Sequence, residues 1–365
     1  MNRKMSVNSI FDNFYIAVIK RYRMWCTNKS FRHYSKLLKM HGIPRKKLTS
    51  EQKKQVDAIW KGVGKYDYKT HRLVYSVTGK FDPKVMSEKL FRSKIEMELN
   101  EQTFKNAWSD KSYFSWWFDK SLFPVNIVAN INGTYYNNDY DVVTEDEALQ
   151  IISKHDKAII KPSLDTGFGK GVSLIEDCKS ADAVKGILGK YGKNFVVQEV
   201  LKQHPMLASF NPSSVNVVRF ISMFIDGEVY PVMCALRCGG EGSISDNNIT
   251  KDGMGMFVIG IDENGNLRDR AYHSCGKSIT VCPNGEEFAG KPFPSYDKMV
   301  ATVKECHKKL PYFRFVGWDF AIDSEGNPRI MEYNIKGPGV LYYQYVNGPL
   351  LGKYTDMIVE RFKKK

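Results

Sequence analysis

The chain has 365 residues, of which 42% are hydrophobic and 26% are charged, a balance typical of a folded protein with two or three subdomains. No apolar run approaches the ~20 residues that a membrane-spanning helix needs, and the N-terminal residues lack the small-residue cleavage site of a secretory signal. The seven scattered cysteines match no zinc-ligand spacing. We therefore expect a cytoplasmic protein with reduced thiols.

The net charge of +14 is concentrated in one part of the chain. Residues 1–100 carry 23 Lys and Arg against 8 Asp and Glu, a surplus of 15, so the remaining residues are nearly neutral together. No DNA- or RNA-binding motif accompanies this charge, and we expect no nucleic-acid partner. The surplus therefore needs a local explanation.

The segment 10–40 is predicted to be helical, because its apolar residues recur every three or four positions. Basic residues follow part of this stripe, and a basic amphipathic helix can lie on an anionic membrane. The alternative is that the stripe packs on the rest of the protein. We favour packing, because aromatic stripes belong more often to a core. The stripe consists of Ile10, Phe11, Phe14, Tyr15, Val18, Ile19, Tyr22 and Trp25, and the basic residues are Lys20, Arg21 and Arg23.

Two further helices are predicted at 50–60 and 83–100, which makes residues 1–105 a mainly helical region. From residue 108 onward, strands alternate with helices, as in an α+β or α/β enzyme. Several predicted strands end at glycine-containing turns. The strands are Lys157–Lys161, Val172–Ile175, Phe195–Glu199, Val215–Phe224, Val229–Arg237, Met256–Ile261, Phe315–Ile322 and Arg329–Tyr333.

A glycine-rich loop follows the strand that ends at Lys161. Its glycines, Gly167, Gly169 and Gly171, stand at alternate positions, where they permit positive φ angles and let backbone N–H groups approach an anion. The Walker pattern Gly-x-x-x-x-Gly-Lys-Ser/Thr is absent. The loop alone is equally compatible with a phosphate site and with an ordinary glycine-rich hairpin.

Arg219 and Arg237 lie in predicted strands among apolar residues. A buried guanidinium needs an anionic partner, and its planar fork suits a phosphate or a carboxylate. A substrate anion and an internal salt bridge are equally compatible with the sequence.

The segment 315–334 is predicted to form a hairpin of two strands joined by a glycine turn. Asp319 lies on the first strand, and Glu332 and Asn334 lie two residues apart on the second, so the three side chains converge. Their oxygens suit Mg²⁺. The alternative, ordinary solvated strand residues, is less favoured, because an unpaired carboxylate in an apolar run is expensive to bury. We expect neither carboxylate to be needed for the fold.

The pattern Gly317-Trp318-Asp319, then Glu332-Tyr333-Asn334 and Gly337-Pro338-Gly339, resembles the metal-binding end of the ATP-grasp superfamily. The resemblance implies an α+β fold of two lobes that grip ATP, preceded by the basic helical region. It divides the chain into residues 1–105, a small lobe at 106–197 and a C-terminal lobe at 198–365. It also implies that Asp319, Glu332 and Asn334 hold two Mg²⁺ ions against the ATP phosphates.

The same resemblance implies nucleotide contacts for several other residues. Lys161 and Lys111 match the two lysines that reach the ATP phosphates, and Gly167 to Gly171 match a loop that closes over them. The strand 195–201 matches the hinge between the lobes. Within this hinge the resemblance places Gln198, Glu199 and Val200 beside the adenine and ribose of ATP.

A further series of residues resembles the sugar-transfer-associated ATP-grasp family of bacterial surface-polysaccharide biosynthesis, over about residues 105–350. The series includes His204-Pro205, Asn211-Pro212, Arg219, Arg237 and Asp246-Asn247. It departs from the family at Asn216-Val217-Val218-Arg219, where the family often reads Asn-Thr-x-Arg.

The implied function is an ATP-dependent ligase that joins a carboxylate to an amine through an acyl phosphate, for example an amino acid to a uronic acid or a lipid-linked sugar. Lys161, Arg219 and Arg237 would be catalytic residues, and ATP and Mg²⁺ the cofactors. Two alternatives stay open, namely a kinase that phosphorylates a sugar or small-molecule hydroxyl and a non-catalytic nucleotide-binding partner of a glycosyltransferase. A membrane-bound N-terminal helix would place the enzyme at the inner face of the membrane.

Overall fold

The computed structural model describes residues 7–164, 170–240, 242–243, 246, 250–282 and 285–363. The predicted phosphate-loop residues Gly167 and Gly169 lie outside the described residues, whereas Gly171 is described. No helix in the described ranges combines the length and the apolar character needed to cross a membrane.

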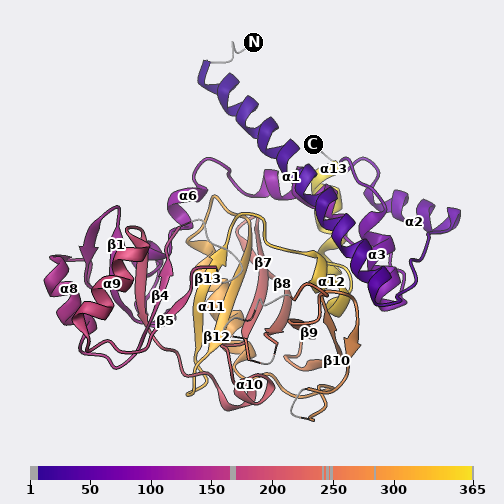
Figure 1. Cartoon of the computed structure of the whole chain (residues 1–365). Coiled ribbons are helices and arrows are strands. Elements are labelled where there is room, and N and C mark those ends of the chain that lie inside the picture. The colour runs from indigo at the N-terminus through magenta and orange to yellow at the C-terminus, as the bar shows by residue number, and fades with distance from the viewer. Residues whose placement is uncertain are drawn as a thin grey trace.

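The fold is α+β, as predicted, and contains two antiparallel sheets (Figure 1). The smaller sheet has six strands and is packed against the helices α8 (Glu145–Ile152) and α9 (Ala181–Tyr191) around its own apolar core. In spatial order its strands are β3 (Val142–Val143), β2 (Thr134–Tyr136), β1 (Asn126–Ile131), β6 (Phe195–Glu199), β4 (Ala158–Pro162) and β5 (Ser173–Ile175).

The larger sheet has seven strands and carries helices on both faces. Helix α11 (Tyr296–Lys308) covers one face, and α12 (Leu341–Asn347) and α13 (Thr355–Lys363) belong to the core on the other. In spatial order the strands are β11 (Ser278–Ile279), β10 (Leu267–His273), β9 (Phe257–Ile261), β8 (Glu228–Cys238), β7 (Val217–Ile225), β12 (Phe315–Ile322) and β13 (Pro328–Asn334).

All eight predicted strands are confirmed within two residues at each end. The sequence analysis missed β1, β2, β3, β10 and β11. Strand β1 carries asparagines at Asn126 and Asn130, and β10 reads Leu-Arg-Asp-Arg, so neither shows the alternation of a half-buried strand. The other three strands have only two or three residues.

The N-terminal region contains the long helix α1 (Val7–Met40), α2 (Ser50–Trp60) and α3 (Lys69–Thr78). The predicted helix at 83–100 is wrong in its first turn, because the helix begins at Glu88. Before Glu88 the backbone contacts Gln344 instead, whose side chain accepts from the Met86 N–H at 2.7 Å and donates to the Met86 carbonyl at 3.2 Å. From Glu88 the chain forms α4 (Glu88–Leu90), a π-helical turn (Phe91–Ile95) and α5 (Glu96–Leu99).

Short helical turns connect these parts, and the turn that carries Lys111 lies at the candidate site described below. They are α6 (Lys105–Trp108), the 3₁₀ turn Lys111–Tyr113, α7 (Phe114–Trp117), the 3₁₀ turn Lys120–Leu122, α10 (Pro205–Phe210) and the 3₁₀ turn Gly352–Tyr354.

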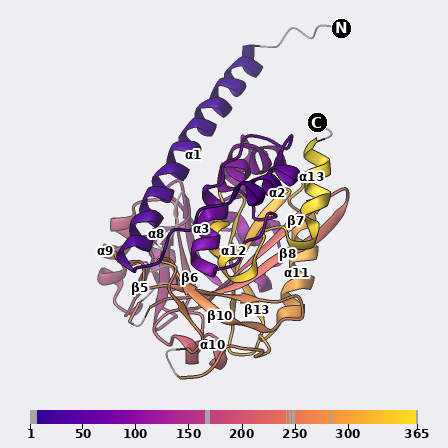
Figure 2. The same cartoon turned by 90° about the vertical axis from the view of Figure 1, so that its right-hand side faces the viewer.

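The first half of α1 projects from the body of the molecule (Figures 1 and 2). Its aromatic stripe does not pack on the rest of the chain as we had favoured, since Phe14 is 69% and Trp25 is 54% exposed. The helix meets the body only in its second half, where Arg23, Phe31 and Leu38 are buried.

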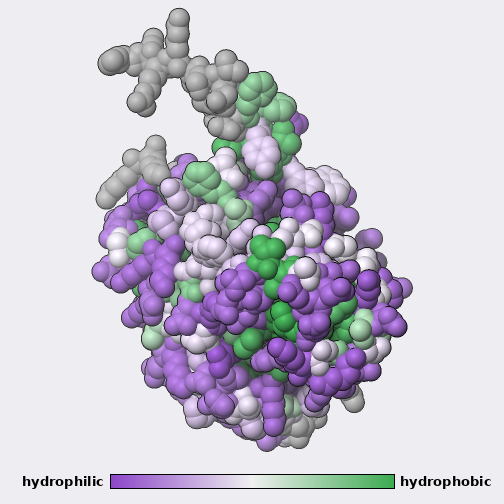
Figure 3. All heavy atoms as spheres, turned by 90° about the vertical axis from the view of Figure 1, so that its left-hand side faces the viewer, coloured by the Kyte–Doolittle hydropathy of each residue, from purple (hydrophilic) through white to green (hydrophobic). Residues whose placement is uncertain are grey.

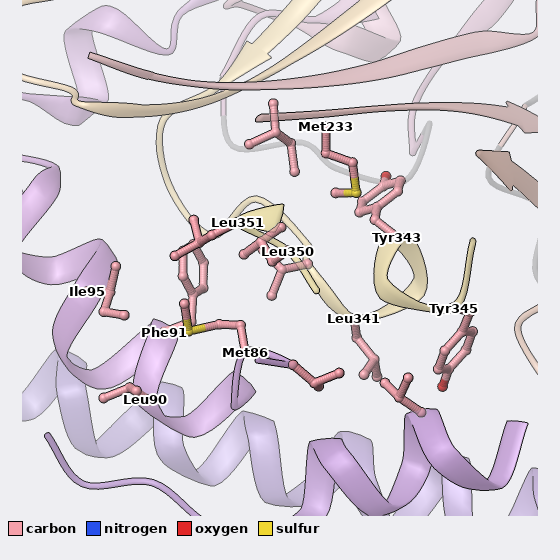
Figure 4. Packing of buried hydrophobic residues seen from close by; sticks show 14 of the residues in the cluster. Met86, Leu90, Phe91, Ile95, Met233, Leu341, Tyr343, Tyr345, Leu350 and Leu351 are labelled. Carbon is pink, nitrogen blue, oxygen red and sulfur yellow. The ribbon is translucent and has the colours of Figure 1, made fainter. Parts of the chain in front are cut away.

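The N-terminal helices share one core with the larger sheet. Figure 4 shows Phe91 and Ile95 of the π-helical turn beside Leu350 and Leu351, with Met233 of β8 beyond them. The predicted division of the chain at residue 105 stays a prediction. The shared core means that the helical region and the C-terminal lobe fold against each other.

A buried histidine links the larger sheet to α11. Trp318 Nε1 donates to Ser222 Oγ at 2.8 Å, and Ser222 Oγ lies 2.7 Å from Nδ1 of His307. Nε2 of His307 lies 2.8 Å from the carbonyl oxygen of Phe313. An indole N–H only donates and a carbonyl only accepts, so the hydroxyl donates to Nδ1 and the imidazole is neutral with its proton on Nε2. Burial accordingly lowers the pKa of His307 to about 4.

We predict that acid destabilises the fold through His307. Its pKa drops from the ordinary 6.5 to about 4 on folding, so the unfolded chain binds more protons below pH 6.5 and stability is lost as the pH falls toward 4. The loss from this group is about 3 kcal/mol. Thermal unfolding of the wild type and of His307→Gln between neutral pH and pH 4 measures it. The variant should lose less stability on acidification, and equal losses in both proteins would contradict the prediction.

Candidate active site

Two predicted lysines and a carboxylate meet where the two sheets approach each other. Lys161 is the second-last residue of β4, and the Lys111 N–H donates to the carbonyl oxygen of Ser163 just beyond that strand, at 3.0 Å. Asp110 caps the turn that carries Lys111 by accepting from the Ser112 N–H at 2.9 Å. The Lys111 ammonium lies 3.4 Å from a carboxylate oxygen of Glu332 on β13. Residues far apart in sequence thus form one charged cluster.

The cluster favours binding of a further anion. Lys161 is buried, and burial, together with the neighbouring charge of Lys111, lowers its pKa to about 8, with Glu332 acting in the opposite direction. Two ammonium groups therefore lie near the Glu332 carboxylate. A phosphate placed beside them would relieve their mutual repulsion.

The hairpin β12–β13 brings the three predicted metal ligands together. Asp319 lies opposite Glu332 and Gly317 lies opposite Asn334, so the three polar side chains share one face of the sheet. The Asn334 amide nitrogen lies 3.4 Å from a carboxylate oxygen of Asp319. A bulge after Asp319 shifts the register of the remaining hairpin. The predicted convergence is confirmed, while metal binding stays a prediction.

Asp319 is held by two arginines. Arg219 donates to both of its oxygens, at 2.5 and 3.0 Å, and Arg237 Nη2 donates to Oδ2 at 3.2 Å. Arg237 also binds Asp246 at 2.7 Å and lies 3.3 Å from the Tyr343 hydroxyl. The structure therefore shows the internal salt bridge that the sequence analysis had left as one of two alternatives.

Burial alone would raise the pKa of Asp319. The positive charges of Arg219 and Arg237 outweigh burial and hold the pKa below its ordinary value. For Asp246 burial dominates and raises the pKa, although Arg237 opposes it. Asp319 is thus an anion, and its negative charge is balanced by Arg219 and Arg237 inside the protein.

The oxygens at this face suit Mg²⁺ in chemical type, but they are not equally available. The carboxylate of Asp319 accepts from both arginines and approaches Asn334, which fills its roughly four lone-pair sites. The Glu332 side chain is 28% exposed and contacts Lys111. Within the described ranges, no three His, Cys, Asp or Glu side chains could hold a metal ion together. Glu332 and Asn334 therefore fit Mg²⁺ as they stand, and Asp319 fits only if a guanidinium moves away.

The predicted hinge residues lie at the end of β6, next to a small cavity of about 190 Å³ lined by Glu199 and Val200. The Gln198 amide donates to Asn126 at 2.7 Å, so this buried side chain joins β6 to β1. The Glu199 N–H donates to the Val125 carbonyl oxygen at 3.0 Å, and its side chain is half exposed beside His155. Their contacts to adenine or ribose stay predictions.

A larger cavity of about 570 Å³ opens from the lysine–carboxylate cluster toward the N-terminal helices. Lys111, Arg219, Arg237, Glu332 and Asn334 line it. Further lining residues, which the sequence analysis missed, are Ser30, His33, Tyr34, Glu88, Arg92, Lys336, Tyr342 and Tyr343. The only signal in the sequence was the i,i+4 spacing of Glu88 and Arg92, which is common on helices and not specific to a site.

The chain matches one protein family and is similar to several solved structures. A family model described as sugar-transfer associated ATP-grasp matches residues 91–359. The match begins inside the π-helical turn and leaves α1, α2 and α3 outside it. A search of curated proteins found no match.

Several solved structures are similar to this chain at low identity. D-alanyl-alanine synthetase A from Vibrio cholerae is 13% identical, covering 70% of this chain and 66% of its own, with a TM-score of 0.40. The biotin carboxylase domain of the 2-oxoglutarate carboxylase from Hydrogenobacter thermophilus, in complex with MgADP and bicarbonate, is 12% identical, with coverages of 69% and 45% and a TM-score of 0.40. The ATP-grasp ligase PsnB with its minimal precursor is 13% identical, with coverages of 75% and 70% and a TM-score of 0.40. This chain thus spans about two thirds, under half and 70% of the three structures' lengths.

We predict that the two carboxylates differ in their effect on stability, contrary to the expectation that neither supports the fold. Asp319→Asn leaves two buried guanidiniums without their shared anion and should cost about 3–5 kcal/mol. Glu332→Gln alters a partly exposed pair with Lys111 and should cost under about 1 kcal/mol. Chemical denaturation of both variants measures the difference. Equal stability of the two variants would show that the arginine pairing contributes little.

Proposed function

Because this chain belongs to the sugar-transfer-associated ATP-grasp family, we propose that it is an ATP-dependent ligase that joins a carboxylate to an amine through an acyl phosphate. We further propose that it acts in the cytoplasm on a saccharide precursor of a surface polysaccharide. The observation that carries the proposal is the meeting of Lys111 and Lys161 with Glu332 and Asn334 at one end of a large cavity.

Each part of the cluster has a distinct task in this reaction. Lys111 and Lys161 bind the phosphates, and their charges offset the negative charge of the triphosphate. Glu332 and Asn334, with Asp319 if its arginines shift, would hold two Mg²⁺ ions, which supply charge neutralisation at the phosphates when bound. Gly171, at φ +73°, lies close to the ring of Pro162. At this residue the chain leaves the loop that we assign to the phosphates.

The two arginines act at the other side of the reacting atoms in this proposal. Arg219 uses Nε and Nη2 on Asp319, which leaves Nη1 without a partner among the described residues. Arg237 is engaged by Asp246, Asp319 and Tyr343 and keeps Arg219 in place through their shared carboxylate. Arg219 Nη1 would therefore bind the substrate carboxylate, and Arg237 would position it.

The bond changes balance without a protein nucleophile. A carboxylate oxygen of the substrate attacks the γ-phosphorus while the bond from that phosphorus to the ADP oxygen breaks. The amine then attacks the acyl carbon, inorganic phosphate leaves, and the amine nitrogen loses a proton. Positioning and electrostatic stabilisation by the residues above supply the catalysis.

Product analysis tests the proposal against its two alternatives. With MgATP, uronic acids and amino acids, we expect ADP, inorganic phosphate and a condensed product lighter by one water than its parts. ADP with a phosphorylated product and no free phosphate would identify a kinase. Nucleotide binding without turnover across the substrate panel would identify a non-catalytic partner. The matched controls are Glu332→Gln and Lys161→Met, which should each lower turnover at least a hundredfold, about 3 kcal/mol.

We also propose that the projecting half of α1 lies on an anionic membrane surface. Phe11, Phe14, Val18, Tyr22 and Trp25 are exposed and recur at helical spacing along one side. Figure 3 shows green and pale spheres over this end of the helix. Amphipathic helices with such aromatic stripes lie in the interface of a bilayer.

Charge complementarity favours lipid over a second copy of this chain as the occupant of the stripe. Helix α1 contains seven Lys and Arg and one Asp. Two copies paired along α1 would bring like charges together, whereas each basic residue near an anionic surface is worth about 1 kcal/mol. Lys20 and Arg21 are exposed beside the stripe, and Lys29 lies over the Trp25 ring at 5.3 Å from its centroid.

Co-sedimentation with lipid vesicles tests this placement. The full-length protein should bind phosphatidylglycerol-containing vesicles, not pure phosphatidylcholine, and lose binding at high salt. Phe14→Ser with Trp25→Ser should abolish binding, while Val142→Ser, an equally exposed apolar residue on β3, should not. Substitutions replace truncation here, because the second half of α1 belongs to the core. Equal binding of all variants would contradict the proposal, as would a stable dimer that depends on Phe14 and Trp25.

A further inference from the structure

The cavity beside the lysine–carboxylate cluster has a second wall, built by the N-terminal helices. Ser30, His33 and Tyr34 of α1 line it, together with Glu88 and Arg92. All of these residues except Arg92 precede the region that the family model matches. The ATP-grasp fold thus accounts for one end of the cavity, and the other end is specific to the helical region of this chain.

Arg92 occupies a rigid position in this wall. It lies in the π-helical turn Phe91–Ile95, and such turns recur at functional sites. Phe91 and Ile95 on either side are fully buried in the core shared with the larger sheet (Figure 4). The backbone that carries Arg92 is therefore fixed against the C-terminal lobe.

Arg92 and its neighbour Glu88 use only part of their hydrogen-bonding capacity. Arg92 Nε donates to Glu88 Oε1 at 2.5 Å, and its two terminal nitrogens have no partner among the described residues. The Glu88 side chain is 8% exposed, and its Oε2 is buried without a hydrogen-bond donor. No donor among the described residues reaches Glu88 Oε2, which is also true of Glu96 Oε2. Most buried carboxylate oxygens have a donor, so a ligand that donates a hydrogen bond here would lower the free energy cost of burying Glu88.

Lys336 adds a second positively charged side chain to the same cavity. Its side chain is exposed and has no ion-pair or hydrogen-bond partner in the described ranges. Glu96 fixes the loop that carries it, because the Gly337 N–H donates to Glu96 Oε1 at 2.6 Å. Arg23 also binds Glu96, at 3.1 Å. One helical segment therefore places Arg92 and holds the loop of Lys336.

We propose that Arg92, Lys336 and Glu88 form the binding site for the second substrate of the ligase. Arg92 and Lys336 bind its anionic group, a carboxylate or a phosphate, and Glu88 Oε2 accepts from a neighbouring hydroxyl or amino group. The ligand class is thus a sugar acid, a sugar phosphate or an amino acid. The assignment of a second substrate rests on the proposed ligase function, whereas the binding of such an anion does not.

The charges of the cavity support this assignment. Arg219 and Arg237 also line it, but Asp319 and Asp246 neutralise them. At the helical end, Glu88 contacts Arg92 only at Nε, so the donors left for a ligand there are the two terminal nitrogens of Arg92 and the Lys336 ammonium, among the described residues. A guanidinium binds carboxylate and phosphate through parallel hydrogen bonds, which suits a ligand of either kind.

Calorimetric titration of the full-length protein tests the site. Glucuronate, glucose 1-phosphate and glutamate are the anionic probes and glucose is the neutral one, each titrated with and without Mg²⁺ and a non-hydrolysable ATP analogue. We expect at least one anionic probe to bind and glucose not to bind. The probe that binds distinguishes a carboxylate from a phosphate ligand.

The variants separate this site from the nucleotide site. Arg92→Gln and Lys336→Gln should each weaken the binding of the anionic probe by about tenfold or more, because each removes a charged hydrogen bond. Lys94→Gln is the matched control, since Lys94 lies on the same helix and pairs with Glu98 outside the cavity wall. Nucleotide affinity should not change in any of the three. Lys336→Gln remains informative if Arg92→Gln unfolds, because Lys336 is exposed.

Two results would overturn the proposal. One is unchanged probe affinity in Lys336→Gln and in folded Arg92→Gln, and the other is the absence of binding by every anionic probe to a protein that binds nucleotide. Failure of the proposed function looks different, because the nucleotide analogue would then not bind while the anionic probes could still bind to the helical end.

Discussion

The pairing of Asp319 with Arg219 and Arg237 is the interaction on which the rest of the site depends. It joins three adjacent strands of the larger sheet, β12, β7 and β8, at a point where all three side chains are buried. A single unpaired charge there would be strongly destabilising, but the two arginines share Asp319, and Asp246 neutralises the second of them. Because these charges balance one another, the sheet needs no further charged partner for them where it presents Glu332 and Asn334 on the same face. Removal of the Asp319 carboxylate would leave two buried guanidinium groups without their shared anion.

The main elements of this face were predictable because they are local. Two strands with a glycine turn fix which side chains of the hairpin share a face, so Asp319, Glu332 and Asn334 follow from a period of two. The strand ending at Lys161 was equally clear from its apolar run. The partners of Asp319 were not predictable, because the sequence shows only that Arg219 and Arg237 need anions and not which anions they meet. The same holds for the contact between Gln344 and the Met86 backbone, which lies where a helix was predicted. The two residues are more than two hundred positions apart in the sequence.

The helical region was predictable as helix but not as a wall of the cavity. Its helices share a core with the larger sheet, so the cavity depends on packing between segments that are distant in sequence. Glu96 illustrates the dependence: it is fully buried, and it binds Arg23 of α1 and the Gly337 N–H of the loop after β13 at once. Glu96 thus connects α1 to the loop that carries Lys336. A membrane contact of the projecting half of α1, as proposed, would act on the same helix that lines the cavity.

The distribution of charge along the cavity favours separate places for two anions in the proposed reaction. At the sheet end, Lys111 and Lys161 lie near Glu332, and burial, with a further contribution from the charge of Lys111, lowers the pKa of Lys161 to about 8. A triphosphate brings several negative charges, and once it is bound the same end would carry an excess of negative charge that Mg²⁺ must offset. Lys336 and the two terminal nitrogens of Arg92, whose Nε contacts Glu88, lie on another part of the cavity wall and stay available to a second anion. Two anions could then occupy one cavity without sharing a cation, which a reaction between a phosphorylated donor and an acidic acceptor requires.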